Sequence, residues 1–435
     1  MQVTSPPSGP ELDPGRDLER RVEDLEALIE EARRRSRRRR QRTAAVVLVA
    51  AAVVCGLLIG FGGHGGGTTG TTALAATRNG PGSNTNDQPL GALPHSVRFV
   101  EGFAFDPRNP RIVYLLAGGP DNSVIKTTDG GAHWQLMPKS GWAGAYQALA
   151  ADPRHPGTLY VGTGVGVLKT VDGGKTWRRS VRGLFVPHVI DRNIGWVAAL
   201  AIDPENSNVV YAGSNRISKS IDGGLSWKTV FSPQSTAGGL NPISVSALAV
   251  APTHPETIYA IHANSKSGHT SIYTSTDSGT TWRTSISVPG FVHGFVTDLA
   301  VDPQHPTTVY AAVGATVLRT TDSGNSWLPI GRGLPVQAGA RGQGCHCRNG
   351  VTILAIDPHR SGAVYAGVNQ GGIYKTTNGG RSWREVAARS LYLRTIVGVD
   401  PQQPATVYGF GQLEYDNSPH LFRTTNAGRT WTSAP

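Results

Sequence analysis

An all-β fold built from seven similar four-stranded units is predicted by three observations. The 435-residue chain contains 55 Gly and 29 Pro, which interrupt helices, and only 16% charged residues, whereas about 25% is usual. Two turn signals alternate from Ser96 onward and return together seven times. Short runs rich in β-branched residues stand between the signals, such as VAALAI and VVYAGS in the third copy. Three cysteines are too few to hold such a chain together by disulfides.

The first turn signal has the form T/S-x-D/N-x-G-x-x-W and ends at tryptophans that are 43 to 56 residues apart. Its acidic or amide side chain accepts backbone N–H bonds across the turn, and its glycine allows a positive φ. The tryptophan then begins the last strand of the unit and is expected to bury its ring between sheets. We therefore interpret the repeated side chains as turn formers: Asp129, Asp172, Asp222, Asp277, Asp322, Asn378 and Asn426.

The second turn signal, typified by D-P-x-x-P-x-x-x-Y, precedes each first one and ends at a tyrosine that re-enters a strand, as in Asp152–Tyr160. Each unit thus has four strands, and seven such units predict a seven-bladed β-propeller around a central channel. Because strand direction alternates, the two turn signals of a blade should share one face. The connections between blades and the turns between second and third strands should share the other.

The N-terminal quarter has a different character. Residues 43–61, TAAVVLVAAAVVCGLLIGF, carry no charge and as a helix would span a bilayer core. The preceding RRRSRRRRQR (Arg33–Arg42) predicts a cytoplasmic N-terminus, with the propeller outside the cytoplasmic membrane of a single-pass protein. The alternative is a cleaved signal peptide with its site near Ala73-Leu74-Ala75.

Upstream of this segment, Leu18, Val22, Leu25, Ile29 and Ala32 have the spacing of a short coiled coil, or of an amphipathic helix lying on anionic headgroups. The predicted division of the chain is therefore a basic cytoplasmic helix at 1–42, a transmembrane helix at 43–61, a flexible linker at 62–95 and the propeller at 96–435. Beyond residue 42 the chain has 30 basic and 21 acidic residues, and this net charge of +9 makes acidic partners plausible. No nucleic-acid motif accompanies that charge, so nucleic acid is not an expected partner.

The first turn signal resembles the Asp-box, or bacterial neuraminidase repeat, over Ser96–Pro435. Proteins with this repeat include sialidases, xyloglucan hydrolases, sortilin-like receptors and photosystem II stability/assembly factor-like proteins. The resemblance implies the propeller fold and implies that the boxes lie away from any ligand. It is not specific for function, but the chain is most similar overall to the assembly factor-like and sortilin-like groups.

Function is expected on the face without turn signals, where residues do not repeat. Two of the nine tryptophans fall outside the boxes, and other aromatic and charged residues accompany them there. The main expectation is a binding or assembly scaffold for an extracytoplasmic protein or peptide, while the alternative is that these tryptophans only close irregular loops. The candidate binding residues are Trp142, Tyr146, His188, Asp191, Arg192, Trp196, His293, Arg341, Arg394 and Tyr415.

A glycoside hydrolase is the alternative function, and a cell-envelope glycan-binding module without turnover is a further one. A hydrolase needs two facing carboxylates, one of them with a raised pKa. The candidates are Asp298, Glu101, Glu414 and Asp416, with Asp191 beside them, and Asp298 is the one charged residue at its position among the seven innermost strands. The sialidase Arg-Ile-Pro motif is missing, and a xyloglucan-hydrolase site resembles a cleft between two propellers, whereas this chain has one.

One loop carries Cys345-His346-Cys347. Outside the cytoplasm the thiols of Cys345 and Cys347 are expected to be oxidised, as a strained loop disulfide or as an intermolecular or redox pair. A metal site would need further ligands, and no cofactor or metal is predicted.

Overall fold

The computed structural model describes residues 90–118, 122–138, 146–184, 196–232, 243–264, 270–288, 296–335, 350–369, 371–387, 391–413 and 416–433. Pro81–Pro435 forms a compact unit that is separate from Met1–Gly80. The predicted N-terminal helix, transmembrane helix and most of the linker lie outside the described residues. Within the described part of the chain, no helix has the length and apolar character needed to span a bilayer.

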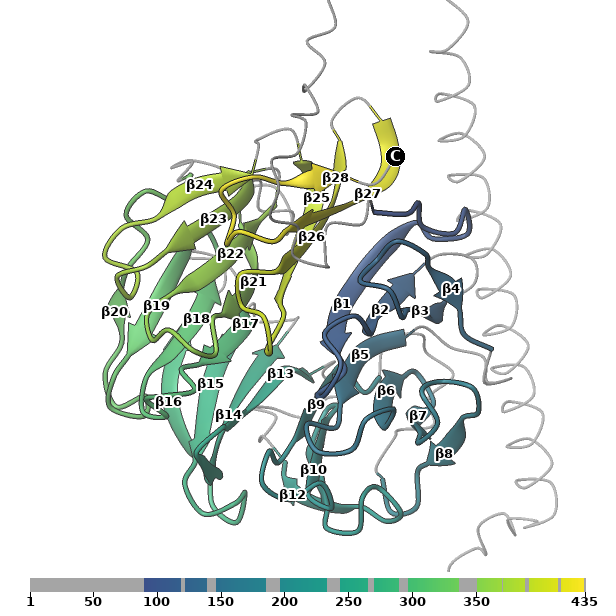
Figure 1. The fold of residues 1–435 in the computed structure, drawn as a ribbon. Coiled ribbons are helices and arrows are strands. Elements are labelled where there is room, and N and C mark those ends of the chain that lie inside the picture. Colours follow the sequence, from purple (N-terminus) through teal and green to yellow (C-terminus); the bar gives the residue numbers. More distant parts are fainter. Residues whose placement is uncertain are drawn as a thin grey trace, which may run out of the picture. The chain divides into compact units, whose positions relative to one another are not determined.

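Seven antiparallel four-stranded sheets follow one another along the chain (Figure 1), which confirms the seven-bladed propeller. Blade 1 is β1 (Phe99–Phe105), β2 (Val113–Gly118), β3 (Ser123–Thr127) and β4 (Gln135–Leu136); blade 2 is β5 (Tyr146–Ala151), β6 (Leu159–Thr163), β7 (Gly166–Thr170) and β8 (Arg178–Ser180). Blade 3 is β9 (Ala199–Ile202), β10 (Val210–Gly213), β11 (Ile217–Ser220) and β12 (Lys228–Phe231); blade 4 is β13 (Ile243–Ala251), β14 (His254–Asn264), β15 (Thr270–Ser275) and β16 (Arg283–Val288).

The remaining blades repeat the same meander of consecutive strands. Blade 5 is β17 (Val296–Val301), β18 (Val309–Val313), β19 (Thr316–Thr320) and β20 (Leu328–Pro329); blade 6 is β21 (Val351–Ile356), β22 (Val364–Val368), β23 (Gly372–Thr376) and β24 (Arg384–Ala387). Blade 7 is β25 (Leu391–Val399), β26 (Val407–Leu413), β27 (Asp416–Thr424) and β28 (Thr432–Ser433).

The ring closes without exchanging a strand between its two ends. The innermost strands contact one another in order from β1 to β25, and β25 contacts β1. Blade 1 is made only from the N-terminal end of the propeller and blade 7 only from its C-terminal end. Side chains therefore close the seam: the Tyr408 hydroxyl donates to the Gly130 carbonyl at 3.1 Å, and the Gln402 amide donates to the Asp106 carbonyl at 3.2 Å.

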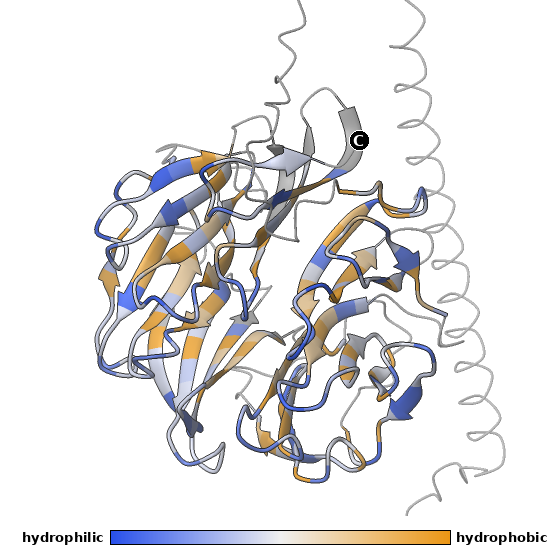
Figure 2. Ribbon diagram, viewed as in Figure 1, coloured by the Kyte–Doolittle hydropathy of each residue, from blue (hydrophilic) through white to orange (hydrophobic). Residues whose placement is uncertain are grey.

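The hydrophobic core consists of seven clusters, each formed where two neighbouring blades pack together. Figure 2 shows the apolar residues along the strands and the hydrophilic ones in the turns. Each cluster combines a second-strand tyrosine of one blade with the box tryptophan of the next, for example Tyr160 with Trp227. All seven of these tyrosines are fully buried: Tyr114, Tyr160, Tyr211, Tyr259, Tyr310, Tyr365 and Tyr408.

The tryptophans are less buried than the sequence predicts. Trp227 and Trp383 are buried, and their indole N–H groups donate to carbonyls of the preceding blade, those of Ser180 and Ile330. The other five box tryptophans keep part of their surface exposed. The difference follows from position. Each box tryptophan stands next to the outermost strand, at the edge of its blade. Each tyrosine stands in the second strand and faces the neighbouring sheet.

The box side chains form hydrogen bonds within their own turns. In blade 3, Asp222 accepts the Ser220 hydroxyl at 2.7 Å and the Ser226 N–H at 2.9 Å, while the Gly224 N–H donates to the Ser220 hydroxyl at 2.8 Å. Hydrogen bonds from the hydroxyl and N–H of Ser226 lower the pKa of Asp222 to about 2. All seven boxes carry this arrangement of hydroxyl, acidic or amide side chain and glycine.

A cation from each blade reaches the box turn of the next one. In blade 2 the Lys169 ammonium lies 5.2 Å from the Tyr160 ring centroid and donates to the Gly223 carbonyl at 2.7 Å, and the Tyr160 hydroxyl donates to the same oxygen at 2.8 Å. Such cation–carbonyl contacts cross all seven interfaces. The acceptors are Gly130, Gly173, Gly223, Ser278, Ser323, Gly379 and Ala427, and their donors in the same order are Arg423, Lys126, Lys169, Lys219, Arg283, Arg319 and Lys375.

The acceptor residue of every contact has a positive φ, from 57° at Ser323 to 73° at Gly130 and Gly173. Glycine adopts this conformation readily, whereas a residue with a Cβ is strained by about 1 to 2 kcal/mol. Only three described non-glycine residues have a positive φ, and all three occupy this position: Ser278, Ser323 and Ala427.

We predict that Ala427→Gly stabilises the propeller by about 0.5 to 1 kcal/mol, because the relieved strain exceeds the added freedom of the unfolded chain. Urea unfolding monitored by tryptophan fluorescence measures the change. Ala132→Gly, at a box position with no positive φ, is the matched control and should not stabilise. A loss of stability in Ala427→Gly would contradict the strain argument.

Candidate functional site

The two turns of each blade lie on one face and bond to each other. In blade 3 the Gly223 N–H of the box turn donates to the Asn208 carbonyl of the turn between β9 and β10, at 2.9 Å, and every other blade has the equivalent bond. We call this side the box face. The opposite side, formed by the turns between second and third strands and by the connections between blades, is called the rim.

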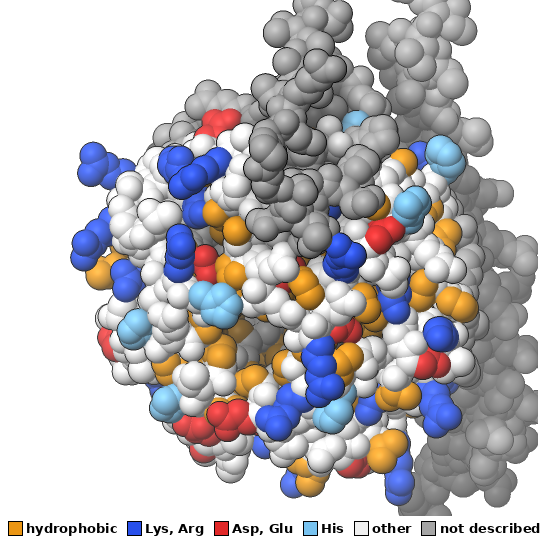
Figure 3. All heavy atoms as spheres, in the orientation of Figure 1, with side chains coloured by type: hydrophobic (Ala, Val, Ile, Leu, Met, Phe, Trp, Pro, Cys, Tyr) orange, Lys and Arg blue, Asp and Glu red, His pale blue; other side chains and the backbone are white. Residues whose placement is uncertain are grey.

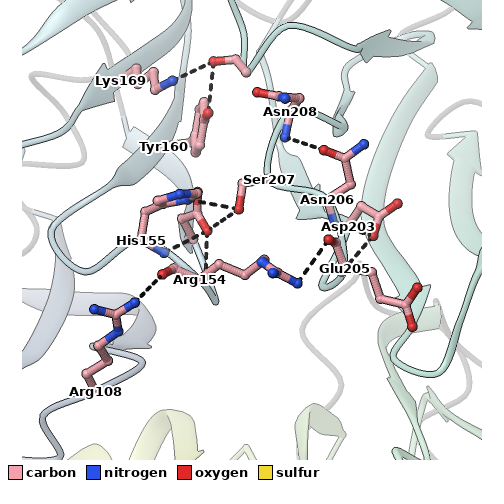
Figure 4. Close-up of polar contacts among 12 residues, drawn as sticks. Arg108, Arg154, His155, Tyr160, Lys169, Asp203, Glu205, Asn206, Ser207 and Asn208 are labelled. Atoms are coloured by element: carbon pink, nitrogen blue, oxygen red, sulfur yellow. Dashed lines mark hydrogen bonds and ion pairs between the residues drawn. The ribbon is translucent and has the colours of Figure 1, made fainter.

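Hydrogen bonds also join the first turns of neighbouring blades on the box face. Figure 4 shows Arg108 donating to the Arg154 carbonyl and Arg154 donating to the Glu205 carbonyl, so that three consecutive blades are linked. Gln304 and Gln402 occupy the same position in their turns as Arg108 and Arg154. Gln304 donates to the His359 carbonyl and so links blade 5 to blade 6, and Gln402 donates to the Asp106 carbonyl and so links blade 7 to blade 1.

The box face contains an Asp, His and Ser in contact, but not in the arrangement of a catalytic triad. His155 Nδ1 lies 3.1 Å from both the Asp152 carboxylate and the Ser207 hydroxyl, and that hydroxyl donates to Asp152 at 2.6 Å (Figure 4). A triad requires one imidazole nitrogen on the carboxylate and the other on the serine. Asp302, His305 and Ser361 repeat the contact between blades 5 and 6. Both sets therefore join blades and do not activate a nucleophile.

The innermost strands share a β-bulge near the rim. In five blades one residue is left out of the pairing with the second strand, and a bulge of this kind re-aims a side chain and is common beside active sites. All five residues are polar: Glu101, Gln147, Ser246, Thr297 and Thr352. Only Glu101 is among the residues predicted from the sequence, although the shared position of all five, five residues before the D-P turn, could have revealed the others.

Asp298 follows the bulge of β17 and has the most perturbed carboxylate of the described residues. Its Oδ1 accepts the Leu299 N–H at 2.9 Å, and its Oδ2 accepts the Leu354 N–H of the next blade at 2.8 Å. Burial raises the pKa of Asp298 to about 7, against the lowering effect of the two N–H donors. Asp298 as a whole residue is half-buried.

The second described carboxylate candidate, Glu101, is half-buried in the bulge of β1. Blades 1 and 5 are not neighbours in the ring, so Glu101 and Asp298 stand on inner strands that do not touch (Figure 1). Glu414 lies outside the described residues, and the side chain of Asp416 is likewise not described.

Trp196 is 40% exposed at the rim, more than any other described tryptophan. Two hydrogen bonds fix the backbone that follows Trp196 to blades 2 and 3. The Val197 N–H donates to the Thr163 carbonyl of blade 2, and the Ala198 N–H donates to the Gly213 carbonyl of blade 3. A Cβ on Gly164 would come within 3.3 Å of the indole nitrogen. Gly164 has no positive φ, so its lack of a side chain serves to make room for the ring.

The other binding candidates are placed as follows. Tyr146 is buried in the core between blades 1 and 2, together with Leu168 and Trp177, so it does not contribute to the surface of the rim. Arg394 belongs to β25, but its side chain is not described. The remaining candidates lie outside the described residues: Trp142, His188, Asp191, Arg192, His293, Arg341 and Tyr415, and with them the thiols of Cys345 and Cys347. No group of three or more metal-ligating side chains occurs among the described residues.

No model of a known protein family matches the chain. A xyloglucanase of Hypocrea jecorina is 24% identical over 366 residues, which cover 77% of this chain and 38% of that protein. A xyloglucanase of a Paenibacillus species is 27% identical over 172 residues, 32% of this chain and 16% of that protein. The chain therefore spans well under half the length of these relatives.

Among solved structures, the GH74 enzyme of Niastella koreensis superposes with a TM-score of 0.53 at 19% identity, over 78% of this chain and 59% of that one. YCF48 bound to a D1 peptide superposes with a TM-score of 0.50 at 14% identity, over 78% of this chain and 99% of that one. At these identities the likenesses show the propeller fold alone.

The expectation of a non-catalytic scaffold for a protein or peptide is wrong by this comparison. The curated relatives described above are xyloglucanases, which favours the glycoside hydrolase alternative. The scaffold expectation gave too much weight to the presence of one propeller and to the missing sialidase motif. Neither the number of propellers nor the sialidase motif determines whether the fold raises the pKa of a carboxyl group, as it does for Asp298.

We predict a pH-dependent contribution of Asp298 to stability. Its pKa in the folded state, about 7, exceeds its ordinary value of 3.8, so the stability it provides at low pH is lost as pH rises from about 4 to about 7. Asp298→Asn removes this dependence. The variant should therefore gain stability relative to the natural protein as the pH of urea unfolding is raised from about 5 to about 8.

The control is Glu205→Gln, which removes an exposed carboxylate on the box face. The amide introduced by Asp298→Asn can accept only one of the two N–H bonds, and this loss is independent of pH. An equal difference between Asp298→Asn and the natural protein at both ends of the pH range would contradict the raised pKa.

Proposed function

We propose that the propeller is a glycoside hydrolase that acts on a xyloglucan-type polysaccharide at the rim end of its channel. The observation that carries the proposal is Asp298, an inner-strand carboxyl with a pKa of about 7 in a chain similar to xyloglucanases. A general acid must be protonated at working pH, and the raised pKa of Asp298 meets that need. It must also reach the leaving oxygen, and the proposal assigns this to the place of Asp298 on the innermost strand β17.

In this proposal Asp298 is the general acid. The N–H groups of Leu299 and Leu354 hold its two oxygens in place, so the carboxyl is oriented before substrate binds. The proton passes to the glycosidic oxygen as the bond to the anomeric carbon breaks. The resulting carboxylate is then stabilised by the same two N–H donors.

The second carboxylate in the proposal is Glu101, acting as general base on a water molecule. Because β1 and β17 belong to separated blades, the two carboxyl groups would act from different sides of the channel and not along one strand. Inverting hydrolysis needs a separation of roughly 6.5 to 9.5 Å between the two carboxyl groups, which leaves room for water between base and sugar. The proposal requires this spacing when substrate is bound and predicts a product of inverted anomeric configuration.

Trp196 supplies a binding surface in this proposal. Sugar rings present an apolar face of C–H groups, which packs against an indole ring that is held rigid and partly exposed. Its backbone bonds to blades 2 and 3 hold the ring ready for ligand, so little freedom is lost on binding.

The proposal also places the propeller outside the cytoplasmic membrane, attached by the apolar segment 43–61 through the linker at 62–95. Polysaccharide substrates are extracellular polymers, so a tethered extracytoplasmic hydrolase would meet them directly. The repeat itself is assigned to the Asp-box type on its hydroxyl, carboxylate and glycine hydrogen bonds.

Hydrolysis of xyloglucan by the purified protein, followed by release of reducing ends, tests the proposal. Asp298→Asn should lower kcat by at least about a hundredfold, because it removes the acid. The natural enzyme should lose activity as pH rises past about 7, the pKa of Asp298. Trp196→Ala should mainly raise KM, by about tenfold.

The control is Glu205→Gln, whose activity should equal that of the natural protein. Equal release of sugar by the natural protein and Asp298→Asn would exclude Asp298 as the acid. No release by the natural protein, combined with quenching of tryptophan fluorescence by xyloglucan oligosaccharides, would exclude the hydrolase and leave a glycan-binding module.

A further inference from the structure

Two adjacent blades carry an aliphatic residue at the second position of the box, where the other five carry threonine. The aliphatic residues are Val171 in blade 2 and Ile221 in blade 3. Both side chains project into solvent, with 66% and 72% of their surface exposed. An aliphatic residue at an exposed position where five sister turns carry threonine contributes nothing to the turn, whose hydrogen bonds use the residues on either side.

A third apolar side chain lies in the same place. Leu225 follows the two glycines of the blade 3 box and is 73% exposed, while the equivalent residues of the other blades are small, polar or basic: Ala132, Lys175, Thr280, Asn325, Arg381 and Arg429. Lys169 of blade 2 binds the Gly223 carbonyl between Ile221 and Leu225, which ties the two blades together at this point. Val171, Ile221 and Leu225 are called the apolar tips.

Basic side chains flank the apolar tips. Lys175 stands in the blade 2 box, and Arg178 and Lys228 begin the outer strands of blades 2 and 3; all three are exposed. The nearby carboxylates, Asp172 and Asp222, are engaged by the hydroxyl and N–H groups of their own turns. Figure 3 shows Lys and Arg side chains spread over the visible face of the molecule, with Asp and Glu side chains among them.

We propose that the apolar tips dock on a bilayer that contains anionic lipid. The tips are aliphatic side chains on projecting turns, and such side chains can enter the boundary between headgroups and acyl chains while flanking Lys and Arg remain with the headgroups. A protein interface more often uses aromatic anchors in a packed centre, and none of the three tips is aromatic. Exposed apolar groups with a basic border fit lipid better.

Docking in this way would orient the propeller. The apolar tips belong to the box face, where the repeated turns are joined by hydrogen bonds, so that face would lie toward the membrane. The rim, with Trp196 and the bulges of the inner strands, would then point away from the membrane. The inference stands on the box turns alone and does not depend on the proposed hydrolase activity.

Vesicle binding by Pro81–Pro435 tests the proposal, since this compact unit contains all seven cores and the contacts that close the ring. Sedimentation with phosphatidylcholine vesicles, with and without phosphatidylglycerol, gives the partition coefficient. We expect binding to the mixed vesicles that weakens with added salt. The double variant Ile221→Thr, Leu225→Asn, which restores residue types found in the sister turns, should bind at least about tenfold more weakly.

Leu328→Thr is the matched control, because Leu328 is 68% exposed on blade 5, away from the apolar tips. It should bind vesicles as the natural propeller does. Absence of binding to the mixed vesicles, or equal binding by the double variant, would overturn the proposal. So would concentration-dependent self-association that the double variant abolishes, because the tips would then be a protein contact.

Discussion

Each interface between blades depends on one contact, in which a cation from one sheet donates to a carbonyl in the box turn of the next. At five of the interfaces the cation also lies over the ring of a fully buried tyrosine. The contact needs a Lys or Arg in reach and a turn whose positive φ presents the carbonyl. Hydrogen bonds to charged donors contribute about 1.5 to 3 kcal/mol each. Because the chain exchanges no strand at its seam, the same contact between Arg423 and Gly130 also closes the ring.

These contacts assign different roles to the two faces. The box face is committed to turns that bond within themselves, to the first turns of their own blades and across to their neighbours. The aspartate carboxylates of its box turns are engaged by their own turns, and its Asp, His and Ser sets serve as links. At the rim, backbone bonds also join neighbouring blades, from the N–H groups of Val197, Val245 and Val351 to the carbonyls of Thr163, Ser214 and Gly314. The inner strands there are interrupted by bulges with polar residues. The rim is where a carboxyl with a raised pKa, that of Asp298, stands on an innermost strand and also accepts an N–H bond from the next blade.

Much of the fold could be predicted from the sequence, because turn chemistry is local. The box and D-P signals gave the blade count, the four strands per blade and the face that both turns share. The importance of the tyrosines over the tryptophans could not be predicted, since both are large and repeated and only packing separates them. Blade 4 shows the same limit. Thr274 stands where the other six blades carry Lys or Arg, and Arg283 supplies the cation from another strand.

The candidate site was only partly predictable. Alignment of the inner strands identified Asp298, but the raised pKa comes from surrounding protein and from blade packing that no single segment encodes. The function expected from the sequence, a scaffold, was wrong, because the repeated turns specify the propeller and carry no information on the chemistry of the non-repeated residues.

The most direct test of the division between faces is a crystal structure with a xyloglucan oligosaccharide bound. The account predicts the sugar at the rim, packed on Trp196 and reaching toward Asp298, with the box turns unchanged. An oligosaccharide bound on the box face, against the apolar tips or the Asp152 and His155 links, would contradict it.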